Sequence, residues 1–322
     1  MSDGAEGAIG GEVPGVAVTD ASAVGGAVLW TALVAAGTFG PVERALALAP
    51  LVLVPLGLGM AATAAFGGAA GRLVGAAAWL QPVGAVLLAA SLALPVGGVP
   101  AAALATPWLL VAAAIGFAAV LRTRARGGLA LPETAADAGF AYLPVGATAL
   151  LLHHLGVTFW FDAAIVFLTA VHFHYAGFLL PVLTGLTGRC AGGSDDRLFR
   201  RVAGVIVVGP ALIAVGISFS PLVEVVAVGV FTVAVALFGG HVLLWVAPTR
   251  PRPQAVLLAV SALALPLSMA LALGYGVSAF TGWSLGLDLA TMVALHGSLN
   301  AFGFGLLGTV GWRLAVPDAT GE

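Results

Sequence analysis

Long apolar stretches, separated by short charged or Pro/Gly-rich breaks, run through almost the whole chain. A bilayer core about 30 Å thick needs about 20 mainly apolar residues in helical form, because lipid offers no partners for backbone polar groups. Cutting the sequence at its breaks predicts spans at 22–39, 45–66, 72–94, 99–121, 139–157, 160–182, 201–219, 222–247, 254–276 and 288–312. The expected fold class is therefore all-α, a polytopic transmembrane helix bundle of about ten spans.

The breaks between these spans leave no room for a soluble domain. The longest polar stretches, 122–137 and 189–201, suit connecting loops, so residues 21–313 are expected to form a single transmembrane helical domain. Residues 1–20 contain acids and no basic residue, unlike the positive start of a signal peptide. We expect a disordered acidic tail over 1–20 and a short tail over 314–322.

Arginines gather in alternate breaks, and cytoplasmic loops of membrane proteins carry the excess of basic residues. With the N-terminus inside, all arginines except Arg44 fall on the cytoplasmic side. These are Arg72, Arg122, Arg124, Arg126, Arg189, Arg197, Arg200, Arg201, Arg250, Arg252 and Arg313. The pattern predicts cytoplasmic N- and C-termini in a multi-pass protein of the cell (cytoplasmic) membrane.

Composition supports a membrane protein and excludes several other classes. The chain is 61% hydrophobic and 8% charged, whereas soluble domains carry about 25% charged residues. A net charge of -2 gives no basic field for nucleic acid. Cys190 is the only cysteine, so no intramolecular disulfide forms. No phosphate-binding glycine motif, nucleophile elbow or HExxH string is found, so a nucleotide-driven pump is not expected, and an enzyme is not the expected class. The apolar spans make the lipid bilayer the expected partner.

All six histidines fall in the second half of the chain, in or at the ends of predicted spans: His153, His154, His172, His174, His241 and His296. Ionisable residues at membrane depth are costly and usually face the bundle interior. Burying a neutral histidine in the membrane costs less than burying a charged residue. The histidines could therefore serve only to form interhelical hydrogen bonds, which contribute about 0.6 kcal/mol each.

Helical geometry groups these residues further. At about 100° per residue, Asp162, Thr169 and His172 share one stripe, and His174 points about 160° away from His172. His296 and Asn300 share a face of the last span. We expect a polar substrate or ion pocket between spans five, six and ten, with candidates His153, His154, Asp162, Thr169, His172, Tyr175, His296 and Asn300. A ridge of small residues on the last span is expected to pack against a neighbouring helix: Gly297, Ala301, Gly305 and Gly308.

Two strings carry a family resemblance. Residues 172–178 read HFHYAGF, and residues 296–304 read HGSLNAFGF. Both resemble strings of the YndJ-like family of prokaryotic integral membrane proteins, and the resemblance covers the membrane core. It implies a polytopic membrane protein with a transporter-like label, and it supplies little mechanism.

Three functions remain open. The first is a small-solute or ion transporter, in which a histidine could titrate near neutral pH. The second is a haem- or transition-metal-binding redox protein or enzyme with His172, His174 and His296 as ligands; the HFHY string is also similar to the haem-ligating helix of haem-copper oxidase subunit I. The third is a non-catalytic membrane component that binds a protein partner or lipid. The substrate, the coupling ion and the oligomeric state are left open.

Overall fold

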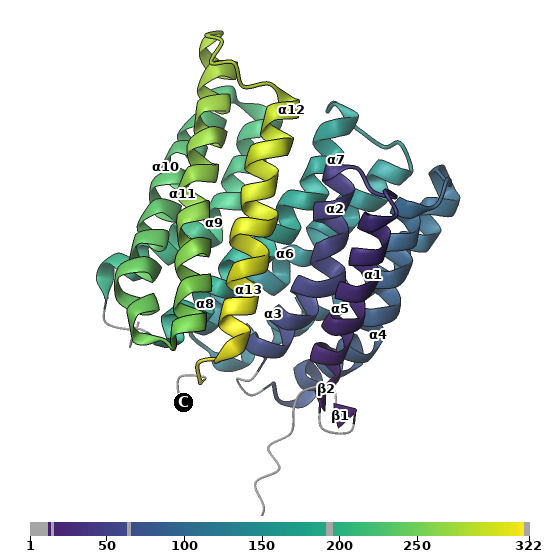
Figure 1. Cartoon of the computed structure of the whole chain (residues 1–322), viewed down its shortest axis with the longest axis vertical. Helices are drawn as coiled ribbons and strands as arrows, with labels where there is room; N and C mark the ends of the chain where they lie inside the picture. The colour runs from purple at the N-terminus through teal and green to yellow at the C-terminus, as the bar shows by residue number, and fades with distance from the viewer. Residues whose placement is uncertain (1–11, 14–15, 63–65, 191–195, 319–322) are drawn as a thin grey trace, which may run out of the picture.

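The computed structural model describes residues 12–13, 16–62, 66–190 and 196–318, and this part of the chain is almost entirely helical (Figure 1). Ten helices in it are long and apolar enough to cross a membrane, which confirms the predicted fold class. They occupy Val18–Ala35, Pro41–Ala61, Gly68–Ala93, Gly98–Arg126, Leu131–His154, Ala163–Cys190, Arg197–Phe219, Pro221–Thr249, Arg252–Thr281 and Leu289–Leu314.

Six of these spans are single α-helices: α1 (Val18–Ala35), α4 (Gly68–Ala93), α5 (Gly98–Arg126), α6 (Leu131–His154), α9 (Arg197–Phe219) and α11 (Arg252–Thr281). A short antiparallel strand pair, β1 (Glu12–Val13) and β2 (Val16–Ala17), precedes α1. The predicted tail over 1–20 lies mostly outside the described residues, and α1 begins four residues earlier than the predicted 22–39.

The other four spans contain π-helical turns, in which hydrogen bonds skip one residue more than in an α-helix. The second span is α2 (Pro41–Leu48), η1 (Ala49–Leu53) and α3 (Val54–Ala61). The sixth is α7 (Ala163–His172), η2 (Phe173–Leu179) and α8 (Leu180–Cys190). The eighth is α10 (Pro221–His241), η3 (Val242–Val246) and η4 (Ala247–Thr249). The tenth is α12 (Leu289–Thr291), η5 (Met292–Gly297), η6 (Leu299–Leu306) and α13 (Leu307–Leu314).

The spans run alternately between the two ends of the bundle. In Figure 1, β1, β2 and the end of α13 lie at the bottom, whereas α7 and α12 begin at the top. We call the lower end the terminal end and the upper end the opposite end. The second span is central, with 83% of its apolar window buried, whereas α1 is peripheral, with 22% buried. The last span returns to this centre, where η5 and η6 contact α2, and α13 contacts α3.

The two polar stretches predicted as long loops are mostly helical, so this prediction was wrong. Helix α5 continues to Arg126 and α6 begins at Leu131, while α8 continues to Cys190. Helix α9 begins at Arg197, where the Asp196 side chain accepts from the Leu198 backbone N–H at 2.8 Å. Residues 191–195 lie outside the described part of the chain. The physical reason is that five charges in these stretches are paired inside the bundle, whereas the exposed arginines of α9 lie on its outer face.

Five of those charges form what we call the arginine–carboxylate cluster, which lies at the terminal end and consists of Arg122, Arg126, Glu133, Asp137 and Arg189. Glu133 accepts from Arg189 Nε at 2.8 Å and Nη2 at 3.0 Å, and from Arg122 Nη1 at 3.1 Å. Asp137 accepts from Arg122 Nε at 2.7 Å and Arg126 Nη2 at 2.9 Å. All five side chains are at most 9% exposed. Because Arg189 also donates to two backbone carbonyls at the end of α3, the cluster joins α3, α5, α6 and α8.

Small residues of the tenth span allow close packing at two positions. A Cβ at Gly305 would lie 2.9 Å from the Tyr175 ring, and one at Gly308 would lie 2.6 Å from Ser261 Oγ. Ala301 is buried, whereas a Cβ at Gly297 would have only the Met292 carbonyl oxygen of its own span within 4 Å. The predicted ridge therefore meets its neighbours mainly in its lower half.

Candidate functional site

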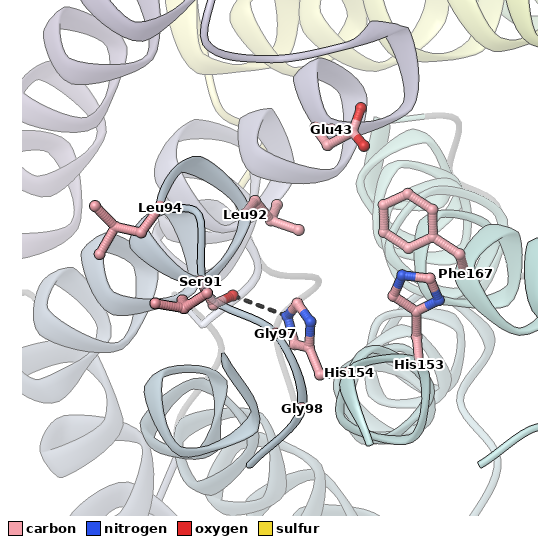
Figure 2. Close-up of a pocket in the computed structure, with 10 residues that line it drawn as sticks. Glu43, Ser91, Leu92, Leu94, Gly97, Gly98, His153, His154 and Phe167 are labelled. Atoms are coloured by element: carbon pink, nitrogen blue, oxygen red, sulfur yellow. Dashed lines mark hydrogen bonds between the residues drawn. The ribbon is translucent and has the colours of Figure 1, made fainter. Parts of the chain in front are cut away.

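An open pocket of about 340 Å³ lies at the opposite end of the bundle. We call it the histidine pocket, and Figure 2 shows its walls, which come from α2, α4, α6, α7 and the turn before α5. Small-molecule sites in proteins commonly measure about 300–1,000 Å³. The pocket is lined by Glu43, Ser91, Leu92, Leu94, Val96, Gly97, Gly98, His153, His154 and Phe167.

The two imidazoles of this pocket are the last two residues of α6. Neighbouring helical residues point about 100° apart, so the two rings face different walls. His153 stacks on Phe167, with ring centroids 4.4 Å apart and an interplanar angle of 17°. His154 lies on the other side, where its Nε2 is 3.1 Å from Ser91 Oγ (Figure 2).

Hydrogen bonding determines which nitrogen of neutral His154 carries the proton. The Ser91 hydroxyl donates its one hydrogen to the Leu88 carbonyl oxygen at 2.7 Å. Its oxygen must therefore accept from His154 Nε2–H, because a hydroxyl has a single hydrogen. The Nδ1 atom of neutral His154 is then left as an acceptor.

Glu43 supplies the carboxylate of the pocket. It lies in the first turn of α2, is half-buried, and takes part in no ion pair within the described part of the chain. It lines the same pocket as His153. A carboxylate is favoured near a helix N-terminus, which is where Glu43 lies.

A second polar group, the His172–His296 pair, lies further along the sixth and tenth spans. The two rings stack with centroids 6.1 Å apart. His172 Nδ1 lies 2.8 Å from the Leu168 carbonyl oxygen, and His296 Nδ1 lies 2.9 Å from the Ser268 carbonyl oxygen. Since a carbonyl only accepts, both Nδ1 atoms carry hydrogen when the rings are neutral, and both Nε2 atoms keep a lone pair.

Asn300 and Ser268 complete this second group. The Asn300 side-chain amide donates to Ser268 Oγ, and to the His296 carbonyl oxygen at 2.9 Å. His172 stands at the junction of α7 and η2, His296 lies in η5, and Asn300 lies in η6. Both strings of the family resemblance thus coincide with π turns, which are frequent at functional sites.

His174 is enclosed on the other face of its helix, as the predicted angle from His172 requires. It is fully buried. Trp108 Nε1 donates to His174 Nε2 at 3.0 Å, and His174 Nδ1 donates to the Ala170 carbonyl oxygen at 2.7 Å. Gly146 provides the space, since a Cβ there would lie 2.7 Å from His174 Nδ1. Both ring nitrogens are thus engaged with neighbouring groups.

The remaining candidates have local hydrogen-bond partners. Asp162 caps α7 by accepting from the Ala164 backbone N–H at 2.8 Å. Thr169 donates to a carbonyl one turn earlier, and Tyr175 donates to the Ala45 carbonyl oxygen of α2, each at 2.8 Å. These three side chains do not line the histidine pocket.

The structure therefore distributes the predicted single pocket over two groups. His153 and His154 line the histidine pocket, whereas His172, His296 and Asn300 lie together elsewhere. The sequence interpretation missed Ser91, Ser268 and Trp108, which are single polar groups inside apolar spans with no periodic signal. Glu43 did have a signal, as an acid at the mouth of a predicted span.

The residues do not fit the haem or metal arrangement. Among the described residues, no three His, Cys, Asp or Glu side chains gather in a group able to hold a metal ion. His172 and His174 point to different surroundings, and both nitrogens of His174 are hydrogen-bonded. The haem- or metal-binding hypothesis stays a prediction without support from these contacts.

Residues 44–304 match the family model described as YndJ-like protein. The chain belongs to the YndJ-like family. It is 31% identical over 235 residues to the protein "Uncharacterized membrane protein YndJ" of Bacillus subtilis (strain 168). The aligned region is 72% of this chain and 41% of that relative, so the chain spans about two fifths of the relative's length. No solved structure matches the chain.

The YndJ-like match confirms the family resemblance carried by the strings at 172–178 and 296–304. It includes the arginine–carboxylate cluster, the His172–His296 pair and almost all of the histidine pocket, whose Glu43 lies one residue before the matched range. The chain is a membrane protein of this family with ten candidate spans.

Proposed function

We propose that the chain is a transporter for a small polar solute, which enters through the histidine pocket. The observation that carries this proposal is the contrast between the two ends of the bundle. One end holds an open pocket of about 340 Å³, and the other is bound together by the buried arginine–carboxylate cluster. A bundle open at one end and closed at the other corresponds to one state of an alternating-access cycle.

The distribution of arginines indicates which end of the bundle faces the cytoplasm. The arginine-rich breaks lie at the terminal end, and basic loops face the cytoplasm. The histidine pocket, at the opposite end, would then open to the outside of the cell. In this state the solute reaches the pocket from outside, and the arginine–carboxylate cluster closes the path to the cytoplasm.

The His172–His296 pair would act on the inward path. His172 is five residues beyond Phe167 of the histidine pocket, or about 7.5 Å along the helix axis. His172 Nε2 offers a lone pair to a solute donor, whereas His296 Nε2 lies 3.3 Å from the side-chain nitrogen of Asn300. The π turns beside both rings supply irregular backbone where a packed span must change shape.

Uptake of a solute mixture into proteoliposomes tests this function and identifies the solute at the same time. Purified protein is reconstituted, incubated with a mixture of small amines, carboxylates and neutral solutes, and the vesicle contents are measured by mass spectrometry. We expect at least one solute to accumulate above protein-free vesicles. His154→Ala should reduce that uptake about tenfold, the equivalent of one lost hydrogen bond of about 1.4 kcal/mol.

His241→Ala is the matched control. His241 packs against Phe199 and Trp245 and lies outside both polar groups. It should transport like wild type. Equal loss in the two variants, or no accumulation of any solute by wild-type protein, would contradict the proposal.

A further inference from the structure

The chemistry of the histidine pocket also indicates which class of solute it binds. This inference rests on the proposed function, because it concerns the same pocket. We propose that the histidine pocket binds a small solute through a protonated amino group. Three features support this: the charge of the lining, the distribution of hydrogen-bond donors and acceptors, and the aromatic wall.

The charge of the lining favours a cation. Glu43 is its single formally charged side chain, and none of the twelve arginines is among the residues described as lining the pocket. A carboxylate that no arginine neutralises attracts a positive ligand, and the attraction is stronger at a partly enclosed site than in bulk water. An anion would meet the same charge as repulsion.

The hydrogen-bonding groups favour a ligand with N–H donors. The Ser91 hydroxyl donates a hydrogen bond to the Leu88 carbonyl oxygen, and His154 Nε2–H donates one to Ser91 Oγ. His154 Nδ1 and the Glu43 carboxylate remain as acceptors. An ammonium group carries three donors and no acceptor, so it matches acceptors of this kind.

The aromatic wall adds a surface that suits a cation. Phe167 and His153 stack within the pocket. A cation within about 6 Å of a phenylalanine ring is attracted by the ring's negative face. The volume of about 340 Å³ is that of a small organic molecule rather than of a single bare ion.

Three probes with one carbon skeleton separate these contributions: isobutylamine, isobutanol and isobutyrate. Binding to the detergent-purified full chain is measured by isothermal titration calorimetry at pH 7.5 and constant ionic strength. We expect isobutylamine to bind at least about tenfold more tightly than either other probe, because only it forms charge-assisted hydrogen bonds with the acceptors. This comparison uses wild-type protein and needs no variant to fold.

Glu43→Gln tests the carboxylate, and Glu224→Gln is its matched control. Both acids are half-buried and lie in the first turn of a helix, but Glu224 does not line the pocket. Glu43→Gln should weaken isobutylamine binding about tenfold, as expected for a lost charge-assisted bond, while Glu224→Gln should leave it unchanged. Equal binding of isobutyrate or isobutanol, or amine binding that survives Glu43→Gln, overturns the proposal.

The same probes distinguish this inference from the proposed function. Glu43-dependent binding of isobutylamine with no uptake of any amine into proteoliposomes supports the binding site and contradicts transport. His154-dependent uptake of a neutral or anionic solute, with no amine binding, supports transport and overturns the inference about the solute.

Discussion

Replacing Glu133 by Gln removes the negative charge that holds two arginines of the arginine–carboxylate cluster. Glu133 accepts from Arg189 at 2.8 and 3.0 Å and from Arg122 at 3.1 Å, and its side chain is 8% exposed. In Glu133→Gln, Asp137 is the one carboxylate of the cluster left to compensate three guanidinium groups. Arg189 then keeps its backbone carbonyl partners and loses its ion pair.

The expected loss of stability follows from this burial. Removing one partner of a buried ion pair costs about 3–5 kcal/mol, because it leaves an uncompensated charge away from water. Glutamine retains one oxygen that can still accept from an arginine, so we expect a value near the lower limit, about 3 kcal/mol. The exposed pair of Asp20 and Arg313, whose Arg313 side chain is 45% exposed, provides a contrast. Pairs of this kind contribute about 0–1 kcal/mol, so Asp20→Asn should be nearly neutral.

Equilibrium unfolding in mixed detergent micelles, followed by circular dichroism, measures both changes in the free energy of unfolding. The two variants make the same acid-to-amide replacement and differ in the burial of the pair. If Glu133→Gln lost no more stability than Asp20→Asn, the cluster would not be the buried ionic closure described above.

Two further predictions concern packing and use the same unfolding assay. Trp108→Phe should lose about 1–3 kcal/mol, because it leaves His174 Nε2 buried without its donor; an unchanged stability would mean that this hydrogen bond is not made. Gly216→Ala should lose about 1–3 kcal/mol, since its Cβ would lie 2.4 Å from the backbone of Glu224. Gly204→Ala, in the same helix with open space beside it, should gain up to about 1 kcal/mol, and equal effects at both glycines would contradict the packing of α9 on α10.

The number of spans was predictable from the sequence because hydropathy and the arginine pattern agree. The first two spans are separate and Ser220 divides the seventh from the eighth, as predicted. The boundary of the fifth span was not predictable in this way. Hydropathy treats each residue separately, so Glu133 and Asp137 are assigned to a loop. In the structure both lie inside α6, because they pair with arginines of α5 and α8.

The candidate site was predictable only in part. Helical spacing correctly separated His172 from His174 and placed His296 beside Asn300. Helical spacing does not indicate which spans are in contact. The sequence analysis therefore placed His154 and His172 in one pocket. The partners that define the two groups come from spans without a periodic polar pattern, as Ser268 in α11 illustrates.

Reversible blocking of the histidine pocket tests the central claim most directly. In a Cys190→Ala background, Gly97→Cys places one thiol at the exposed rim, where a Cβ meets no atom within 4 Å. The cells are treated from outside with a membrane-impermeant methanethiosulfonate reagent, and uptake of the transported solute is measured before labelling, after labelling, and after reduction. The account predicts that labelling abolishes uptake and that reduction restores it. Complete labelling with unchanged uptake, or no labelling until the cells are permeabilised, would contradict entry through an outward-facing pocket.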